Sequence, residues 1–174
     1  MFRIASIVIA CCLLGAAVVK GQDDDAELRA QLEQLFPEAV SFSGKEGDPP
    51  HFKAYGPVTS GGEPELLGLV FWTTELDPLE RGYDGPIKVL VGMDTQGVLT
   101  RVFVTEHREP YGYFSIDLPS FVTQFESKNI RDRFRVGEDI DSISRATITV
   151  RSASRAVRNS SRRAARAHLV PPEQ

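Results

Sequence analysis

A hydroxyl-rich stretch near the C-terminal end of the chain holds the residues best suited to chemistry. Residues 141–147 read Asp-Ser-Ile-Ser-Arg-Ala-Thr and lead directly into a pattern typical of a helix. A threonine hydroxyl is a weak nucleophile, so the site suits a hydroxyl that a second protein modifies. Small neighbours such as Ser144 and Ala146 let a phosphate approach, and the helix N-terminus favours its charge. The stretch predicts Thr147 as the attachment point of a phosphate-bearing group; a helix cap made by Ser144 or Thr147 is the alternative.

The elements that must position this stretch follow from hydrophobic periodicity and turn residues. Some segments repeat apolar residues at helical spacing, and others combine β-branched and aromatic residues with turn signals. The predicted helices cover residues 23–37, 117–125 and about 150–168, the predicted strands 51–55, 66–74, 87–93 and 98–105, and a loop 75–86. Asp23, Asp24 and Asp25 are the expected N-cap of the first helix. This order predicts an α+β fold, a single domain with a mostly antiparallel sheet and flanking helices.

The N-terminal segment has the layout of a secretory signal. An apolar run over residues 4–19 is flanked by Arg3 and Lys20. As a helix this run reaches about 24 Å, short of a hydrocarbon core of about 30 Å, which favours a cleaved signal over an uncleaved membrane anchor. We therefore expect an exported, periplasmic or otherwise extracytoplasmic protein. The expected division is a signal peptide at 1–21, one domain at 22–168 and a disordered C-terminal tail at 169–174.

Composition excludes several classes of function. Both cysteines, Cys11 and Cys12, lie in the predicted signal, so the mature chain is expected to hold no disulfide, thiolate metal site or iron–sulfur cluster. Residues 22–150 carry 12 Lys and Arg against 23 Asp and Glu, whereas residues 151–174 carry six Arg against one Glu. An acidic body argues against nucleic-acid binding. A redox role would need an organic cofactor, or haem or a metal held without cysteine.

Several motifs, in order along the chain, resemble one known family. Residues 141–147 are similar to the flavinylation motif of FMN-binding domains, which runs Asp, small, any, Ser/Thr, Ser/Gly, Ala, Thr. The matching residues are Asp141, Ser142, Ser144, Ala146 and Thr147, and Arg145 replaces the small Ser or Gly. Residues 35–39, 67–71, 82–87, 91–94 and 106–110 resemble the extracytoplasmic FMN-binding domain of the regulators of nitrous-oxide and nitrite reductase expression. The family includes flavinylated subunits of the Rnf complex and of the sodium-pumping NADH:quinone reductase.

The resemblance implies a covalent cofactor and an electron-carrying role. In the family, the last Thr of the motif carries FMN through a phosphoester placed by a flavin transferase that uses FAD, which assigns covalent FMN to Thr147. Gly82, Tyr83 and Gly85 are the expected wall of the isoalloxazine pocket, because glycine permits close approach and Tyr83 can stack on the ring. An ordinary turn is an equal alternative for this loop.

Three more residues are candidates for contacts with the cofactor. His107, beside Glu106, would hydrogen-bond a flavin or ligate a metal, and a satisfied residue at a strand end is its alternative. No second His lies nearby in the sequence, so a metal is not expected. Arg145 would lie over the flavin phosphate as a charge-assisted partner, or be a solvated charge at a helix start.

Two classes of function compete. The first is an electron carrier with covalent FMN that serves an unidentified, membrane-bound redox partner. The second is a flavin-free binding or assembly module of a membrane-associated redox or regulatory complex. Asp141 and Thr147 favour the carrier, whereas Arg145 points to the module. An extracytoplasmic hydrolase ranks last, because the sequence has no Ser-His-Asp pattern, no Gly-x-Ser-x-Gly and no His/Cys metal spacing.

Arginines recur along the last predicted helix at spacings that place them on one face. This arginine stripe consists of Arg151, Arg155, Arg158, Arg162 and Arg166. No Asp or Glu in residues 151–168 can form an i,i+4 pair with it, so like charges repel by about a few tenths of a kcal/mol each. The stripe predicts docking to anionic lipid headgroups or to an acidic redox partner; a solvated face is the alternative.

Overall fold

The structure is a computed structural model that describes residues 15–58 and 62–169, with side chains from residue 25 onward. The chain divides into two compact units, of which the first ends at Gln31 and the second begins at Leu32. The second unit holds the sheet and all later helices of the described residues. Most of the predicted signal segment and nearly all of the predicted tail lie outside the described residues. Within the described part of the chain, no helix is long and apolar enough to cross a membrane.

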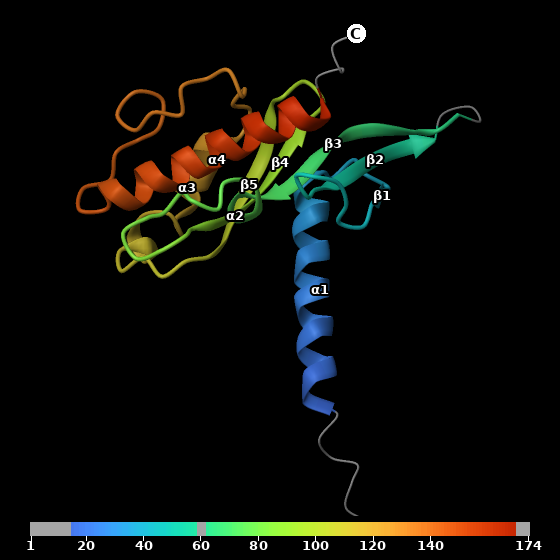
Figure 1. The fold of residues 1–174 in the computed structure, drawn as a ribbon, viewed down its shortest axis with the longest axis horizontal. Helices are drawn as coiled ribbons and strands as arrows, with labels where there is room; N and C mark the ends of the chain where they lie inside the picture. The colour runs from blue at the N-terminus through green and yellow to red at the C-terminus, as the bar shows by residue number, and fades with distance from the viewer. Residues whose placement is uncertain (1–14, 59–61, 170–174) are drawn as a thin grey trace, which may run out of the picture. The chain divides into compact units, whose positions relative to one another are not determined.

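A five-stranded antiparallel sheet forms the centre of the second unit (Figure 1). Its strands lie side by side in chain order. They are β1 (Ser41–Phe42), β2 (Phe52–Val58), β3 (Pro64–Trp72), β4 (Lys88–Asp94) and β5 (Leu99–Glu106). The predicted hairpin is present as β4 and β5, and Gly97 in its turn has φ of 77°, a left-handed angle that glycine adopts without strain. The sheet and its flanking helices confirm the predicted α+β class.

The first helix begins upstream of the predicted start. The α-helices are α1 (Gly15–Leu35), α2 (Thr73–Leu76), α3 (Pro119–Val122) and α4 (Thr147–His168), with 3-10 turns η1 (Gly112–Phe114) and η2 (Thr123–Phe125). Asp23, Asp24 and Asp25 therefore lie inside α1, and their predicted role as its N-cap is wrong. Ala16 and Ala17 are strong helix formers, and no proline interrupts the chain before Pro37.

The predicted strand over residues 66–74 ends earlier than expected. Thr73 and Thr74 belong to α2, which also shortens the predicted loop that follows. The buried Thr73 hydroxyl donates to the carbonyl of Ile87 at 3.2 Å and accepts from the N–H of Val89 at 3.0 Å. A side chain here takes over hydrogen bonds that a continuing strand would make through its backbone, so the chain can turn into a helix.

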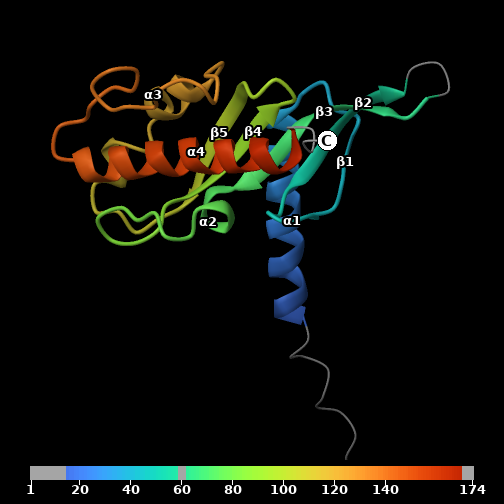
Figure 2. The same ribbon diagram turned by 45° about the horizontal axis from the view of Figure 1, so that its top comes forward.

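Helix α4 lies across one face of the sheet (Figures 1 and 2). It begins at Thr147, three residues before the predicted start at Val150, and ends at His168 as predicted. Small and β-branched residues of its buried face pack on the sheet, among them Val150, Ala153 and Val157. Small side chains bring the helix close to the strands, which makes α4 the element that carries the candidate site.

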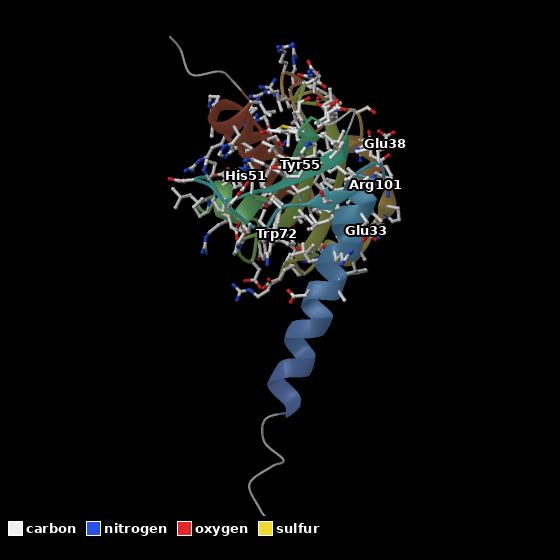
Figure 3. The ribbon with its side chains drawn as sticks, turned by 90° about the vertical axis from the view of Figure 1, so that its right-hand side faces the viewer. Glu33, Glu38, His51, Tyr55, Trp72 and Arg101 are labelled. Carbon is white, nitrogen blue, oxygen red and sulfur yellow. The ribbon has the colours of Figure 1, made fainter. Side chains whose placement is uncertain are left out.

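The opposite face of the sheet receives the C-terminal end of α1. A Cβ atom at Gly68 would lie 2.6 Å from the Phe36 ring, and one at Gly92 would lie 3.2 Å from Leu35. Leu35 and Phe36 are 1 % and 6 % exposed. Glycines in β3 and β4 thus leave the space that these two side chains fill. Tyr55, Trp72 and Arg101, from β2, β3 and β5, are half-buried (Figure 3).

Candidate functional site

The first turn of α4 has no side-chain cap. Ala146 occupies the N-cap position and its N–H donates to the carbonyl of Ile143 at 3.1 Å. Thr147 is half-buried, and its hydroxyl has no hydrogen-bond partner among the described residues. Capping by Ser144 or Thr147, the alternative drawn from the sequence, is not what the structure forms. The turn keeps free N–H groups beside the positive end of the helix dipole, an arrangement that favours an anion.

The residues before Thr147 form an exposed turn with one buried anchor. Asp141, Ser142 and Ser144 are exposed, whereas Ala146 is 2 % exposed and packs in the core. The N–H of Asp141 donates to Oε1 of Gln124 at 2.6 Å, which ties the turn to η2. The predicted attachment residue, Thr147, therefore follows an exposed turn whose last residue, Ala146, is anchored in the core.

Arg145 has a backbone conformation that favours glycine. Its φ is 69°, in the left-handed region, where an L-residue costs about 1–2 kcal/mol. The side chain is exposed and has no partner within the part of the chain that the structure describes. The backbone angle gives a physical reason for a Gly at the matching position of the flavinylation motif, in addition to the need for space.

The buried carboxylate of Glu109 joins α4 to the loop that holds residues 82–85. Glu109 is 6 % exposed. Its Oε2 accepts a short hydrogen bond from the Thr149 hydroxyl and a second bond from the N–H of Tyr83 at 3.0 Å, and its Oε1 accepts from the N–H of Asp84 at 2.8 Å. A Cβ at Gly82 would lie 2.4 Å from Oε1, so only glycine fits. Glu109 thus brings together two segments that the sequence analysis assigned to one site.

Glu109 and Thr149 were not predicted as site residues. Glu109 stands in the sequence element Glu-His-Arg-Glu-Pro, where it resembles any other surface acid. The available signals in the sequence were His107, two residues earlier, and Pro110, the next residue, which together indicate an irregular loop. A carboxylate that accepts three hydrogen bonds from distant donors is recognisable only in the folded chain.

The loop over residues 82–85 presents Tyr83 to solvent. The N–H of Gly82 donates to the carbonyl of Gly85 at 2.7 Å, and Gly85 has φ of 119°, which requires glycine. Tyr83 is 70 % exposed, although its N–H is held by Glu109. The loop is therefore fixed at its backbone while a flat aromatic side chain stays available for stacking.

His107 is satisfied by partners within the chain. Its Nδ1 accepts from the N–H of Glu109 at 3.1 Å, which leaves Nε2 to donate to Oδ1 of Asp117 at 2.7 Å. A Cβ at Gly112 would lie 2.1 Å from the ring, so the backbone packs directly on it. His107 holds Glu109 in place, and both of its ring nitrogens are already used. No group of His, Cys, Asp and Glu in the described part of the chain could hold a metal ion.

Glu106 is not joined to the first turn of α4. Its side chain is exposed at the end of β5 and lies 3.9 Å from the Lys88 ammonium. None of its hydrogen bonds or ion pairs within the described residues reaches residues 141–147. The structure thus brings Gly82, Tyr83 and Gly85 toward α4 through Glu109, and leaves Glu106 outside this arrangement.

The segment that leads to the motif is fixed by Asp139. Its carboxylate accepts from the N–H of Arg135 at 2.6 Å, the N–H of Phe134 at 2.9 Å and the Lys128 ammonium at 3.1 Å. Burial alone would raise the pKa of Asp139, but these donors together hold the pKa below its ordinary value. Phe134, at φ of 51° and 2 % exposed, is held in a strained conformation that this network stabilises.

The predicted arginine stripe is partly engaged within the chain. Nε and Nη2 of Arg155 donate to the two oxygens of Glu80 at 3.0 and 2.7 Å. Nε and Nη2 of Arg162 donate to the carbonyls of Ile130 and Asp132, both at 2.7 Å. Partners far away in the sequence thus take the place of the missing i,i+4 acids for Arg155 and Arg162. Arg151 and Arg166 are exposed and have no partner among the described residues.

Comparison with known proteins identifies this arrangement. Residues 82–161, from the glycine loop to the middle of α4, match the FMN-binding domain family. Over this stretch the chain is similar to an FMN-binding domain. The matched region begins at Gly82 and includes Glu109 and Thr147. Its two ends are thus the segments that Glu109 joins in space.

The chain is also similar to parts of longer curated proteins. The chain is 28 % identical to the regulatory protein NosR of Pseudomonas aeruginosa over 148 residues, 79 % of this chain and 20 % of that protein. It is 33 % identical to the G subunit of the ion-translocating oxidoreductase complex of Vibrio vulnificus over 88 residues, 45 % of this chain and 42 % of that protein. For the corresponding protein of Vibrio parahaemolyticus the identity is 30 % over 112 residues, 59 % of this chain and 50 % of that protein. The chain spans a fifth to a half of these relatives.

Proposed function

We propose that this FMN-binding domain carries FMN covalently, through a phosphoester to Thr147, and transfers electrons in an extracytoplasmic space. The observation that carries the proposal is the position of Thr147. It ends the motif and begins α4 with a hydroxyl that has no partner among the described residues, next to free N–H groups. A phosphate bound to that oxygen would be stabilised by the helix N-terminus, as anions generally are.

The proposed attachment is a balanced group transfer from FAD. The Thr147 oxygen forms a bond to the phosphorus of the FMN half, the pyrophosphate P–O bond breaks and AMP leaves, while the hydroxyl proton is lost. A flavin transferase is the proposed catalyst, because no general base is joined to Thr147 among the described residues. The exposure of Asp141, Ser142 and Ser144 leaves an approach for that second protein.

The loop over residues 82–85 is the proposed contact of the isoalloxazine ring. Tyr83 presents an exposed aromatic face on a backbone that Glu109 fixes relative to α4. Bound FMN would supply reversible electron uptake and release, and the protein would orient the ring and set its surroundings. His107 acts indirectly in this proposal, since it holds the N–H of Glu109 and has no ring nitrogen left for a flavin.

The proposed partners are a flavin transferase and a membrane-bound redox protein. The names of the relatives support a redox setting, since two of them belong to an ion-translocating oxidoreductase complex. We propose that residues 1–21 direct export and that the mature chain starts near Gln22. N-terminal sequencing of the extracytoplasmic fraction tests this, and an intact Met1 would contradict it. Docking to an anionic membrane surface would use the free arginines, Arg151 and Arg166.

Intact-mass spectrometry tests the attachment directly. After coexpression with a flavin transferase, the protein should gain the mass of one FMN less water, and a Thr147→Ala variant should not. Thr149→Ser keeps the buried hydroxyl bonded to Glu109 and serves as a control that should still be modified. Covalent flavin that survives in the Thr147→Ala variant would falsify the assignment.

A flavin-free binding or assembly module is the second candidate. The observation in its favour is Arg145, a bulky charge where the flavinylation motif has Ser or Gly. An absorption spectrum of the protein purified with and without the transferase separates the two candidates. A flavin band that requires the transferase supports the carrier, and no flavin under either condition supports the module.

A further inference from the structure

A pocket lies between α4 and the segment that leads to the motif. Its volume is about 290 Å³, and four of its six lining residues are arginines. The lining residues are Phe134, Arg135, Val136, Arg151, Arg155 and Arg158. We propose that this arginine pocket binds a phosphate group, as a site separate from Thr147.

The charge of the pocket is not neutralised by the chain. Glu80 pairs with Arg155, Glu138 pairs with both Arg135 and Arg133, and Asp77 also acts on Arg155. Arg151 has no partner among the described residues. Counting Arg133, five guanidinium groups face three carboxylates, so a positive excess of two charges remains, which matches a phosphate monoester dianion.

Free donors remain on the arginines that the carboxylates hold. Arg155 uses Nε and Nη2 on Glu80, so its Nη1 is free, and Arg135 uses only Nη1 on Glu138. Arg158 donates through Nε to the amide oxygen of Asn159 at 3.2 Å, which leaves both of its terminal nitrogens free to donate to a ligand. Planar guanidinium forks bind phosphate through paired N–H donors, and arginines positioned in advance lose less entropy on binding.

Both walls of the pocket are fixed before any ligand binds. On one side Asp139 holds the N–H groups of Phe134 and Arg135, as described above. On the α4 side, Arg162 donates to the carbonyls of Ile130 and Asp132. These bonds fasten to the helix the residues that come just before Phe134. Phe134 lines the pocket from the segment that leads to the motif, and its strained φ of 51° persists because the surrounding structure holds it.

Size and position define the ligand. Pockets for whole drug-sized ligands begin at about 300 Å³, so this volume suits a phosphate group with a short attached portion. Arg151 lies one turn beyond Thr147, about 6 Å along the helix axis, but Arg155 and Arg158 lie two to three turns beyond it, about 12 and 16 Å. They are too far to hold a phosphate esterified to Thr147. A lipid headgroup and a soluble phosphate ester share the required chemistry.

Titration with inorganic phosphate tests the pocket independently of flavin attachment. The full-length Thr147→Ala protein, which cannot carry FMN there, is titrated at constant ionic strength and followed by calorimetry. We expect saturable binding of one phosphate, weakened at least tenfold in Arg151→Gln/Arg158→Gln. Arg166→Gln removes a charge from α4 outside the pocket and should bind as the parent does. Arg151→Lys, which keeps the charge but loses the fork, should fall between them.

The outcomes separate the proposal from its alternatives. Absence of saturable binding would overturn the proposed phosphate site. Equal weakening by Arg166→Gln would also overturn it, because the general positive charge of α4 would then explain the binding. Neither Arg151 nor Arg158 has an ion pair among the described residues, so the double variant should unfold at the parent's temperature, which a thermal melt verifies. Failure of flavinylation would leave this result unchanged, because the tested protein lacks Thr147.

A vesicle assay identifies the source of the phosphate. Phosphatidylcholine vesicles with and without phosphatidic acid are compared for cosedimentation. Binding that needs phosphatidic acid, is lost in Arg151→Gln/Arg158→Gln and is reversed by inorganic phosphate assigns the pocket to a lipid headgroup. Phosphate binding without vesicle binding assigns it to a soluble ester. Vesicle binding that the double variant retains excludes the headgroup as the pocket's ligand.

Discussion

At the scale of single residues, Arg145 shows how one backbone angle can set the chemistry of a motif. Its φ of 69° lies where glycine is unstrained, one residue before the N-cap of α4. The same side chain is exposed beside the proposed attachment residue Thr147. The backbone conformation and the need for access thus both favour a small residue at position 145. Experiments can separate the two effects.

Replacing Arg145 with Gly should stabilise the fold by about 0.5–1 kcal/mol. The relieved left-handed strain of about 1–2 kcal/mol exceeds the extra entropy that Gly loses on folding. Urea unfolding measures this change. Arg145→Ala removes the charge and the bulk but keeps the strain, so it should leave stability within about 0.5 kcal/mol of the parent. Equal stabilisation by Ala and Gly would show that the backbone angle is not the cause.

At the scale of elements, one buried carboxylate joins a loop to a helix. Glu109 bonds Thr149 in α4 and the N–H groups of Tyr83 and Asp84. These partners are separated from it by 25 to 40 residues. Helix packing alone would leave the loop free to move relative to Thr147. The hydrogen bonds of Glu109 fix the position of the loop relative to α4. They require a side chain as long as that of Glu.

Glu109→Gln should lower the free energy of unfolding by about 1–3 kcal/mol. Gln keeps one acceptor oxygen, but its NH2 group cannot accept from N–H as the second carboxylate oxygen does, so at least one buried donor loses its partner. Glu106→Gln, a change of the same kind at an exposed acid in the same sequence element, should stay within about 0.5 kcal/mol of the parent. Urea unfolding compares the two. Limited proteolysis should cut the 82–85 loop faster only in Glu109→Gln; equal rates would argue against a fastening role.

At the scale of the whole molecule, α4 is fastened at both ends to distant parts of the chain. Near its end, Nε2 of His168 donates to the carbonyl of Pro49 at 3.0 Å, and Nδ1 of His51 to the same carbonyl at 3.1 Å. The two imidazole rings lie 4.0 Å apart, and Nε2 of His51 is buried without a partner among the described residues. Burial first, and the neighbouring His168 next, lower the pKa of His51 below 6.5, despite the bond to Pro49.

Stability should therefore fall when the pH drops below about 6.5. The unfolded chain then binds a proton at His51 that the folded chain resists, so the free energy of unfolding decreases until folded His51 also titrates. Lys53, which pairs with Glu46 at 3.0 Å beside it, stays charged across this range because that pairing raises its pKa. Asp139 and Glu80 have lowered pKa values and reduce stability only at more acidic pH, below about 4.5.

Urea unfolding between pH 7.5 and 5.5 measures this effect. His51→Gln cannot titrate, so its free energy of unfolding should change less over this range than that of the parent. The slope with pH is the readout, because the substitution itself lowers stability at every pH. An unchanged slope in His51→Gln would assign the pH dependence to another group.

Local patterns predicted most of the secondary structure, and they are the basis of the proposed attachment at Thr147. Alternating apolar residues and a turn glycine define the β4–β5 hairpin, because strand period and turn geometry are local properties. For the same reason the motif was expected just before the last helix, although α4 begins at Thr147 itself. The start of α1 was missed because the acids at 23–25 suit either an N-cap or a helix interior.

Long-range contacts decided the rest of the candidate site. The hydrogen bonds of Glu109 to Thr149 and to the 82–85 loop, the partners of Arg155 and Arg162, and the arginine pocket all join residues far apart in sequence. A charged side chain obeys no short period, and its partner is set by which elements the hydrophobic core brings together. Residue type and spacing therefore predicted where a phosphate would attach, whereas only the packing of α4 on the sheet decided which charges surround it.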